Sequence, residues 1–188
     1  MEFAVRESDL DKQQHVNNVQ YVQWVQDIAE AHWEARATPE QKEKYLTKLT
    51  TGESIGAFCL SEPEAGSDAT SQRTTAIDKG DHYLLNGTKN WITNGGTADY
   101  YLVIAQTDKE KGHKGINAFI VEKSWEGFEV GPKEDKLGIR GSDTHSLIFN
   151  DVKVPKENRI GEDGFGFKFA MKTLSKQLLS TRSLASCI

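Results

Sequence analysis

The sequence predicts a mainly β fold with helical segments on either side of it. Between Glu53 and Ile160, short runs rich in Val, Ile, Phe, Tyr and Thr alternate with Gly, Asn and Asp, which is typical of strands joined by tight turns. Apolar spacing of three and four residues, typical of an amphipathic helix, occurs only before and after this region. Because no helical stretch separates the strands, a small barrel or sandwich is favoured over a doubly wound sheet.

The strands are expected at residues 82–85, 88–93, 100–106, 115–122, 128–131 and 144–154. The dipeptide Asn86-Gly87 stands between the first two and is the preferred composition of a type I′ turn. The sequence therefore predicts a hairpin at this point, followed by a second turn at Asn94-Gly95.

Helix signals are clearest just before the β region. Thr38 is a predicted N-cap, Pro39 takes the first helical position, Gln41 completes a capping box and Gly52 ends the helix. Two further helices are expected. One carries the apolar stripe Val22, Val25, Ile28 and Ala29, and the other carries Phe167, Ala170, Met171, Leu174 and Leu178.

Composition excludes several classes of function. A net charge of −5 with mixed signs argues against a nucleic-acid or anionic-membrane surface, because either requires concentrated basic residues. Apolar runs such as 55–60 are too short to cross a bilayer, and the first residues lack the basic character of a targeting peptide. The sequence thus predicts a soluble, cytoplasmic protein without nucleic-acid or membrane partners. The histidines show no metal-ligand spacing and are expected at the surface.

Three segments suggest a ligand site. In the first, residues 59–71, an apolar strand ends at Leu60, and the following Gly66-Ser67-Asp68 offers a flexible backbone with free N–H groups. In the second, Trp91 and Thr93 stand two apart on a strand and share a face on which a planar cofactor could stack. The third is the polar loop 136–144. Taken alone, the segments are more typical of an ordinary turn, a core tryptophan and a solvated loop.

Together, in this order and spacing, the segments resemble the acyl-CoA dehydrogenase family over about residues 38–174. The resemblance also includes Val152-Lys153-Val154-Pro155 and the residues that lead into the last helix, 161–167. The sequence GAFCLSEPEAGSD is most similar to that of short-chain, butyryl-type members. It implies a β-barrel like the family's middle domain. It also implies an FAD-dependent oxidoreductase of fatty acid metabolism that forms a double bond between the α and β carbons of a short-chain acyl-CoA.

The resemblance assigns roles by position. Residues expected to bind FAD are Phe58, Leu60, Ser61, Trp91, Ile92 and Thr93, and residues expected to meet the acyl-CoA substrate are Gly66 and Ser67. The Ser61 hydroxyl would reach the pyrimidine end of the flavin, Trp91 would pack on the ring, and the Thr93 hydroxyl would reach N5. Hydrogen-bond donors that point at the reducible end of the flavin stabilise the negative charge that develops there as hydride arrives. For the full enzyme, the resemblance implies electron-transfer flavoprotein as a partner and assembly into a homo-oligomer.

The sequence departs from the family at both ends. The family's catalytic base is a glutamate in a C-terminal helical bundle, so no residue here is assigned as catalytic, and beyond Leu174 the sequence no longer follows the family. The expected organisation is a helix at 38–53 from the end of the dehydrogenase N-terminal domain, a flavin-binding β domain at 54–161 and a truncated start of the C-terminal helical domain at 162–188. Weak FAD binding and no turnover are expected.

Residues 1–37 instead resemble the opening of hotdog-fold acyl thioesterases, in which an acidic or Asn residue activates water against the thioester. By position Asp11, His15 and Asn17 would be the candidates. A lone amphipathic helix cannot bury its apolar face by itself, so a vestige of fusion is favoured over an independent activity. A thioesterase fragment and a nonfunctional fusion product remain the alternative interpretations.

Overall fold

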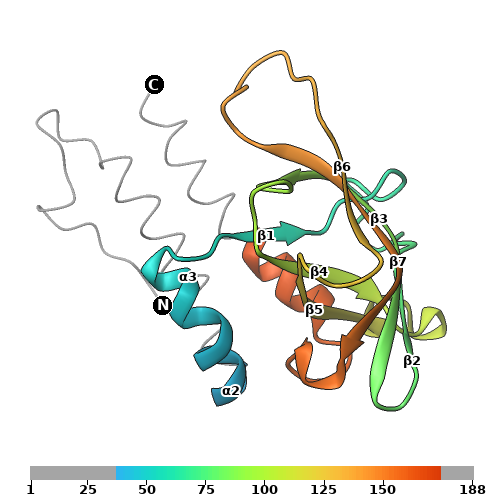
Figure 1. The fold of residues 1–188 in the computed structure, drawn as a ribbon. Coiled ribbons are helices and arrows are strands. Elements are labelled where there is room, and N and C mark those ends of the chain that lie inside the picture. Colours follow the sequence, from blue (N-terminus) through green and yellow to red (C-terminus); the bar gives the residue numbers. More distant parts are fainter. Residues whose placement is uncertain (1–36, 175–188) are drawn as a thin grey trace, which may run out of the picture. The chain divides into compact units, whose positions relative to one another are not determined.

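A mixed eight-stranded sheet is the centre of the structure, a computed structural model that describes residues 37–174 (Figure 1). The strands are β1 (Gly56–Cys59), β2 (Thr75–Asp78), β3 (His82–Thr93), β4 (Tyr100–Gln106), β5 (Ile116–Glu122), β6 (Phe128–Lys133), β7 (Thr144–Pro155) and β8 (Arg159–Ile160). Their order is β6-β7-β3-β2-β4-β5-β8, with β1 pairing in parallel to β4. The mainly β class is confirmed. The sheet is not closed into a barrel, because the outer strands β6 and β8 do not pair with each other.

The predicted hairpin at Asn86-Gly87 is wrong. β3 runs through these residues without turning, and its pairing with β7 shifts register between Leu85 and Gly87, which marks a β-bulge. The Asn86 side chain bonds Asp151 twice, through Nδ2 to Oδ1 at 2.8 Å and through Oδ1 from the Asp151 N–H at 2.9 Å. A dipeptide that favours turns therefore forms part of a bulge between the long strands β3 and β7. The hairpin that the structure contains here joins β2 to β3.

The main core cluster is apolar. Apart from Ala98, which lies between β3 and β4, its members are strand residues: Ala57, Cys59, Ala76, Tyr83, Leu85, Ile92, Ala98, Tyr101, Val103, Ala105, Phe119, Val121, Leu147, Phe149, Val152 and Val154. β5 is buried along almost its whole length, since both of its faces are covered. A rigid core of this kind fixes the ends of β1 and β3, where the predicted cofactor residues lie.

The predicted helix at 38–52 is confirmed. It comprises α2 (Pro39–Gln41), a π-helical segment η2 (Lys42–Leu46) and α3 (Thr47–Thr51), begins with the capping box of Thr38 and Gln41, and ends at Gly52 in the left-handed conformation. Its buried Tyr45 donates to Glu122 Oε1 at 2.9 Å and accepts from Asn158 Nδ2 at 2.8 Å. These bonds attach the helix to β5 and to the 3₁₀ turn η4 (Lys156–Asn158).

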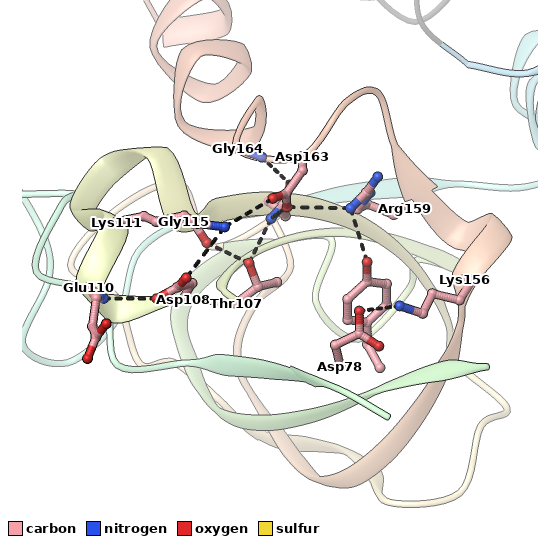
Figure 2. Close-up of polar contacts among 12 residues, drawn as sticks. Asp78, Thr107, Asp108, Glu110, Lys111, Gly115, Lys156, Arg159, Asp163 and Gly164 are labelled. Carbon is pink, nitrogen blue, oxygen red and sulfur yellow. Dashed lines mark hydrogen bonds and ion pairs between the residues drawn. The ribbon is translucent and has the colours of Figure 1, made fainter. Parts of the chain in front are cut away.

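A polar network holds the start of the closing helix, which begins at residue 166 (Figure 2). The buried Asn117 side chain donates to Asp163 Oδ1 and to Thr107 Oγ1, both at 2.9 Å, and accepts from the Gly164 N–H. Asp163 also pairs with Arg159 at 3.4 Å and with Lys111 of the 3₁₀ segment η3 (Lys109–Gly115) at 3.6 Å. The network satisfies polar groups at the helix entry that would otherwise be buried without partners.

Residues 1–36 and 175–188 lie outside the described part, and so do the expected helix around Val22–Ala29 and the thioesterase candidates Asp11, His15 and Asn17. The predicted domain boundaries remain predictions. In residues 37–174 no helix is long and apolar enough to cross a membrane. The same residues contain no group of three His, Cys, Asp or Glu side chains arranged to hold a metal ion.

Candidate functional site

Two of the three sequence segments meet in space at the ends of β1 and β3. The Asn90 N–H donates to the Ser61 carbonyl at 2.9 Å, and Lys89 Nζ donates to the Leu60 carbonyl at 3.0 Å. Residues about thirty positions apart in the chain thus form one continuous site, in which Ser61 lies beside the strand that carries Trp91 and Thr93.

At the end of β3, two exposed side chains stand on either side of a buried one. Ile92 is 2% exposed and packs in the core, whereas Trp91 is 62% exposed and Thr93 is exposed as well. Trp91 and Thr93 are therefore both open to solvent at this end of the strand. An indole left open to this degree offers a flat apolar surface to a planar ligand.

Trp91 has an unusual backbone. Its φ is +60°, a left-handed conformation that costs a bulky residue on the order of 1–2 kcal/mol. The register between β3 and β7 shifts between Lys89 and Ile92, so a bulge accommodates this conformation. Strain of this kind persists where the surrounding structure imposes it, and it is concentrated at functional sites.

The predicted β1 residues differ in burial. Leu60 and its neighbour Cys59 are buried, whereas Phe58 and Ser61 are half-buried. Neither the Ser61 N–H nor the Ser61 hydroxyl has a hydrogen-bond partner among residues 37–174, and the same holds for the Thr93 hydroxyl. The site therefore presents two hydroxyls and a backbone N–H that can donate to a ligand, on residues that adjoin the end of β3 where Trp91 lies.

Gly66 and Ser67 follow a tight turn in which Glu62 and Ala65 exchange two backbone hydrogen bonds. Both residues are exposed. No hydrogen bond or ion pair in the described part of the chain joins them to Ser61 or Trp91. The next residue, Asp68, accepts from Thr70 and Ser71, and these hydrogen bonds lower the pKa of its carboxyl group. The structure thus places the expected substrate residues at the surface, directly after this turn.

The turn after β3 is held by Asp143, from the third sequence segment. Its Oδ2 accepts from the N–H groups of Gly96 at 2.8 Å and Thr97 at 2.9 Å, and its Oδ1 lies 2.7 Å from His145 Nε2. Burial alone would raise the pKa of Asp143, but these hydrogen bonds and the nearby His145 lower it. His145, expected at the surface, is largely buried, with Nδ1 2.7 Å from the Gly131 carbonyl.

The rest of the third segment is a solvated loop, as its composition allowed. Leu137 is fully exposed and Ile139 is 83% exposed. The loop is closed at its base by Lys136, whose Nζ donates to the Ser142 carbonyl and to Thr144 Oγ1.

Sequence reasoning missed a buried ion pair behind the site. Lys89 Nζ lies 2.7 Å from Glu62 Oε1, and the Lys89 side chain is completely inaccessible to solvent. Burial would raise the pKa of Glu62, but Lys89 and the N–H groups of Arg73 and Thr74 lower it; burial lowers the pKa of Lys89. The available signal was a lysine at an inward-facing strand position, where the alternating pattern requires an apolar residue.

The site suits a planar, reducible heteroaromatic ring. It combines an exposed indole at the end of β3 with two hydroxyls and an N–H group that have no hydrogen-bond partner within the described residues. An isoalloxazine ring has both a flat face and a polar pyrimidine end, so the residues present fit FAD.

Comparison with known proteins agrees with this chemistry. The chain is 56% identical over 137 residues to the short-chain specific acyl-CoA dehydrogenase of Clostridium acetobutylicum, a match that covers 73% of this chain and 36% of that protein. Butyryl-CoA dehydrogenase from Megasphaera elsdenii has a similar structure, with a TM-score of 0.78 and 51% identity over 81% of this chain and 40% of that one. An acyl-CoA dehydrogenase complexed with FAD from Bacillus anthracis gives a TM-score of 0.67 and 47% identity over 73% of this chain and 23% of that one.

The chain thus spans about 36% of the length of the curated relatives it matches. A second family description, the acyl-ACP thioesterase C-terminal domain, matches residues 1–93. The acyl-CoA dehydrogenase middle domain matches residues 57–152, just over half of the chain and the part that carries the site. With the relatives above, this match shows that the chain belongs to the acyl-CoA dehydrogenase family of FAD-dependent oxidoreductases.

Proposed function

We propose that this chain supplies the flavin platform for the α,β-dehydrogenation of a short-chain acyl-CoA, with FAD as cofactor. The observation that carries the proposal is the junction of Ser61 with β3, which sets donors without a partner among residues 37–174 next to the end of β3 that carries the exposed and strained Trp91. Similarity to short-chain and butyryl-CoA dehydrogenases supports the choice of substrate class.

Each residue has a distinct task in this proposal. Trp91 provides the stacking surface, and the Ser61 N–H and hydroxyl donate to the polar end of the ring. The Thr93 hydroxyl donates from the same end of β3 as Trp91, while Ile92 and Leu60 hold the two segments in the core. FAD, when bound, supplies the hydride acceptor. Because these donors are fixed before the reaction, they stabilise developing negative charge without reorganisation.

The substrate and partners are assigned from the relatives. We propose that Gly66 and Ser67, on their exposed turn, meet the thioester or pantetheine part of the acyl-CoA. Electron-transfer flavoprotein as electron acceptor, a homo-oligomeric assembly and a cytoplasmic location belong to the same proposal.

The binding step is tested with the full 188-residue chain. FAD titration, followed by the visible spectrum and flavin fluorescence, should give saturable but weak binding, with quenching by the stacked indole. Trp91→Ala should weaken binding by roughly 1–3 kcal/mol, the range for stacking on an aromatic side chain, and remove much of the quenching. Leu137→Ala, on the exposed loop, is the matched control. Equal binding by the wild type and Trp91→Ala would contradict the platform.

The chemical step is tested with butyryl-CoA and a dye acceptor. We expect no product from this chain alone, because no residue in it is assigned as the base that removes the α proton. Measurable turnover at wild-type FAD occupancy would show that a base is present.

A second candidate function rests on the thioesterase match to residues 1–93. Release of free thiol from an acyl thioester, measured for the wild type and for Asp11→Ala, tests it. Hydrolysis that depends on Asp11 would favour the thioesterase over the dehydrogenase platform, whereas equal background rates would remove this candidate.

A further inference from the structure

The Glu62–Lys89 pair occupies a place where the fold alone would favour apolar side chains. Lys89 follows Tyr83 and Leu85 on the inward face of β3, and Glu62 is 5% exposed. Removing two charges from water costs several kcal/mol per ion, and buried pairs are often replaced by apolar residues without loss of stability. Stability therefore does not explain why these two charges lie here.

The contacts of Lys89 point to a different role. Its Nζ donates to Glu62 Oε1, to the Leu60 carbonyl at 3.0 Å and, at 3.4 Å, to Gln72 Oε1. Leu60 directly precedes Ser61 in the chain, and Lys89 lies two residues before Trp91. One ammonium group thus ties the backbone of the β1 segment to the strand that carries the indole.

Glu62 completes the clamp from the other side of Ser61. Its carboxylate accepts from the Arg73 N–H at 2.6 Å and from the Thr74 N–H at 3.2 Å, so it also fixes the chain as it returns toward β2. The Asn90 N–H, next to Lys89, bonds the carbonyl of Ser61 itself. Ser61 is therefore held on both sides, while its own N–H and hydroxyl have no partner in the part of the chain that the structure describes.

We infer that Glu62 and Lys89 are positioning residues for the flavin site, which set the Ser61 donors at a fixed place relative to Trp91 and Thr93. The inference rests on the proposed FAD function. Both side chains are buried behind the site, so they act through Leu60, Ser61 and Asn90. An apolar residue at position 89 would fill the same space but would leave the Leu60 carbonyl and the Glu62 carboxylate without their partner.

The test compares Glu62→Gln/Lys89→Met with Tyr45→Phe in the full chain. The double variant removes both charges with little change in volume, and the amide oxygen that replaces the Glu62 carboxylate can still accept from the N–H groups of Arg73 and Thr74. Tyr45→Phe removes a buried hydrogen-bonding group in a different part of the unit, at the contact of the helix with β5. Far-UV circular dichroism first establishes that the wild type and both variants are folded.

The first readout is amide hydrogen exchange without FAD. Loss of the clamp should speed exchange at the Asn90 amide by about tenfold or more in the double variant, through local opening, while amides of the β4–β5 ladder keep their wild-type rates. Tyr45→Phe should speed exchange at Asn90 no more than at the β4–β5 amides, which report the loss of global stability. Wild-type exchange at Asn90 in the double variant would overturn the inference.

The second readout is FAD titration followed by flavin fluorescence and by induced circular dichroism of the flavin band. The double variant should bind at least about tenfold more weakly, with an altered flavin spectrum, because the donors are no longer preorganised. Tyr45→Phe should stay within about twofold of the wild type, since its change lies away from the donors. Wild-type affinity and spectrum in the double variant would also overturn the inference. If the wild type itself binds no FAD, the proposed function fails, while the exchange experiment still decides whether the clamp exists.

Discussion

At the scale of single residues, the backbone conformation of Trp91 costs stability and therefore points to a functional role for this side chain. A φ of +60° is natural for glycine and costly for tryptophan, yet a large aromatic side chain stands there exposed to solvent. A sequence selected for stability alone would place a glycine at this position. The indole is therefore best explained by what it binds.

This strain can be measured with a pair of substitutions. Trp91→Gly is expected to be more stable than Trp91→Ala by up to about 1 kcal/mol, because glycine adopts the left-handed conformation without the penalty that a Cβ brings. Urea unfolding followed by far-UV circular dichroism measures the difference. At Thr88, in the same strand with ordinary φ, the order should reverse, with glycine about 0.5–1 kcal/mol less stable than alanine. If the Trp91→Gly variant were less stable than Trp91→Ala, the backbone at position 91 would not be strained.

The lowered pKa of Glu62 predicts a dependence on pH. Its folded-state pKa lies below the ordinary value of 4.5, so the unfolded chain takes up a proton first as the pH falls. The stabilising contribution is complete above about pH 4.5 and is lost as the pH falls through the folded-state value. Glu62→Gln should flatten the slope of unfolding free energy against pH in this acid range by up to about 1.4 kcal/mol per pH unit. Chemical unfolding at several pH values between about 3 and 6 checks this, and parallel slopes in the two proteins would count against it.

At the scale of elements, the long strand β3 decides much of the architecture. It pairs with β2 on one side and β7 on the other, and two bulges divide it into three parts with different roles. The residues before Gly87 form the hairpin with β2, Lys89 belongs to the buried ion pair, and Trp91 and Thr93 are open to solvent. The second bulge changes which side chains face inward, since Lys89 and Ile92, three residues apart, are both buried.

The bulge at Gly87 gives a sharp prediction. A Cβ at this position would lie 2.6 Å from Thr74 Oγ1 and 2.7 Å from Thr74 Cα, whereas a Cβ at Gly80 would meet no atom within 4 Å. Both glycines have positive φ, so alanine is strained at either one. Gly87→Ala should therefore lose about 1–3 kcal/mol more than Gly80→Ala, the usual cost of overpacking. Thermal unfolding of the two variants checks this, and similar losses would show that Thr74 moves aside freely.

The sequence was sufficient for elements whose signals are local. The capping box at Thr38 and Gln41 and the strands β4, β5 and β7 were predicted nearly to their ends, because periodicity and capping depend on neighbours in the chain. The hairpin predicted at Asn86-Gly87 was wrong because the same dipeptide occurs in turns and in bulges. Here the bulge is stabilised by Asp151, which is distant in the sequence. The Glu62–Lys89 pair was missed for the same reason: only the three-dimensional fold brings these two residues together.

At the scale of the described unit, residues 37–170 cluster as one body that includes the helix at 39–51. The helix contributes Tyr45 to β5 and η4, and Gln41 Nε2 donates to the carbonyl of Arg159 at 3.1 Å. Tyr45 also meets Tyr100 of β4 edge-to-face, with ring centroids 5.0 Å apart. A segment that the resemblance assigns to the preceding domain is thus built into the β unit.

This integration predicts that helix and sheet unfold together. Tyr45→Phe should lower the free energy of unfolding by about 1–3 kcal/mol, because the Asn158 amide loses a buried acceptor, and the transitions seen by far-UV circular dichroism and by tryptophan fluorescence should stay coincident. Thr50→Ala is the control, since Thr50 is exposed and bonds only to carbonyls of its own helix, at Leu46 and Thr47, so its loss should stay within about 0.5 kcal/mol. A helix that melted separately, with the sheet transition unchanged in Tyr45→Phe, would show that it belongs to another folding unit. Coincident transitions would instead mean that the flavin platform and this helix share one cooperative core, in which a substitution at the helix contact lowers the stability of the whole platform.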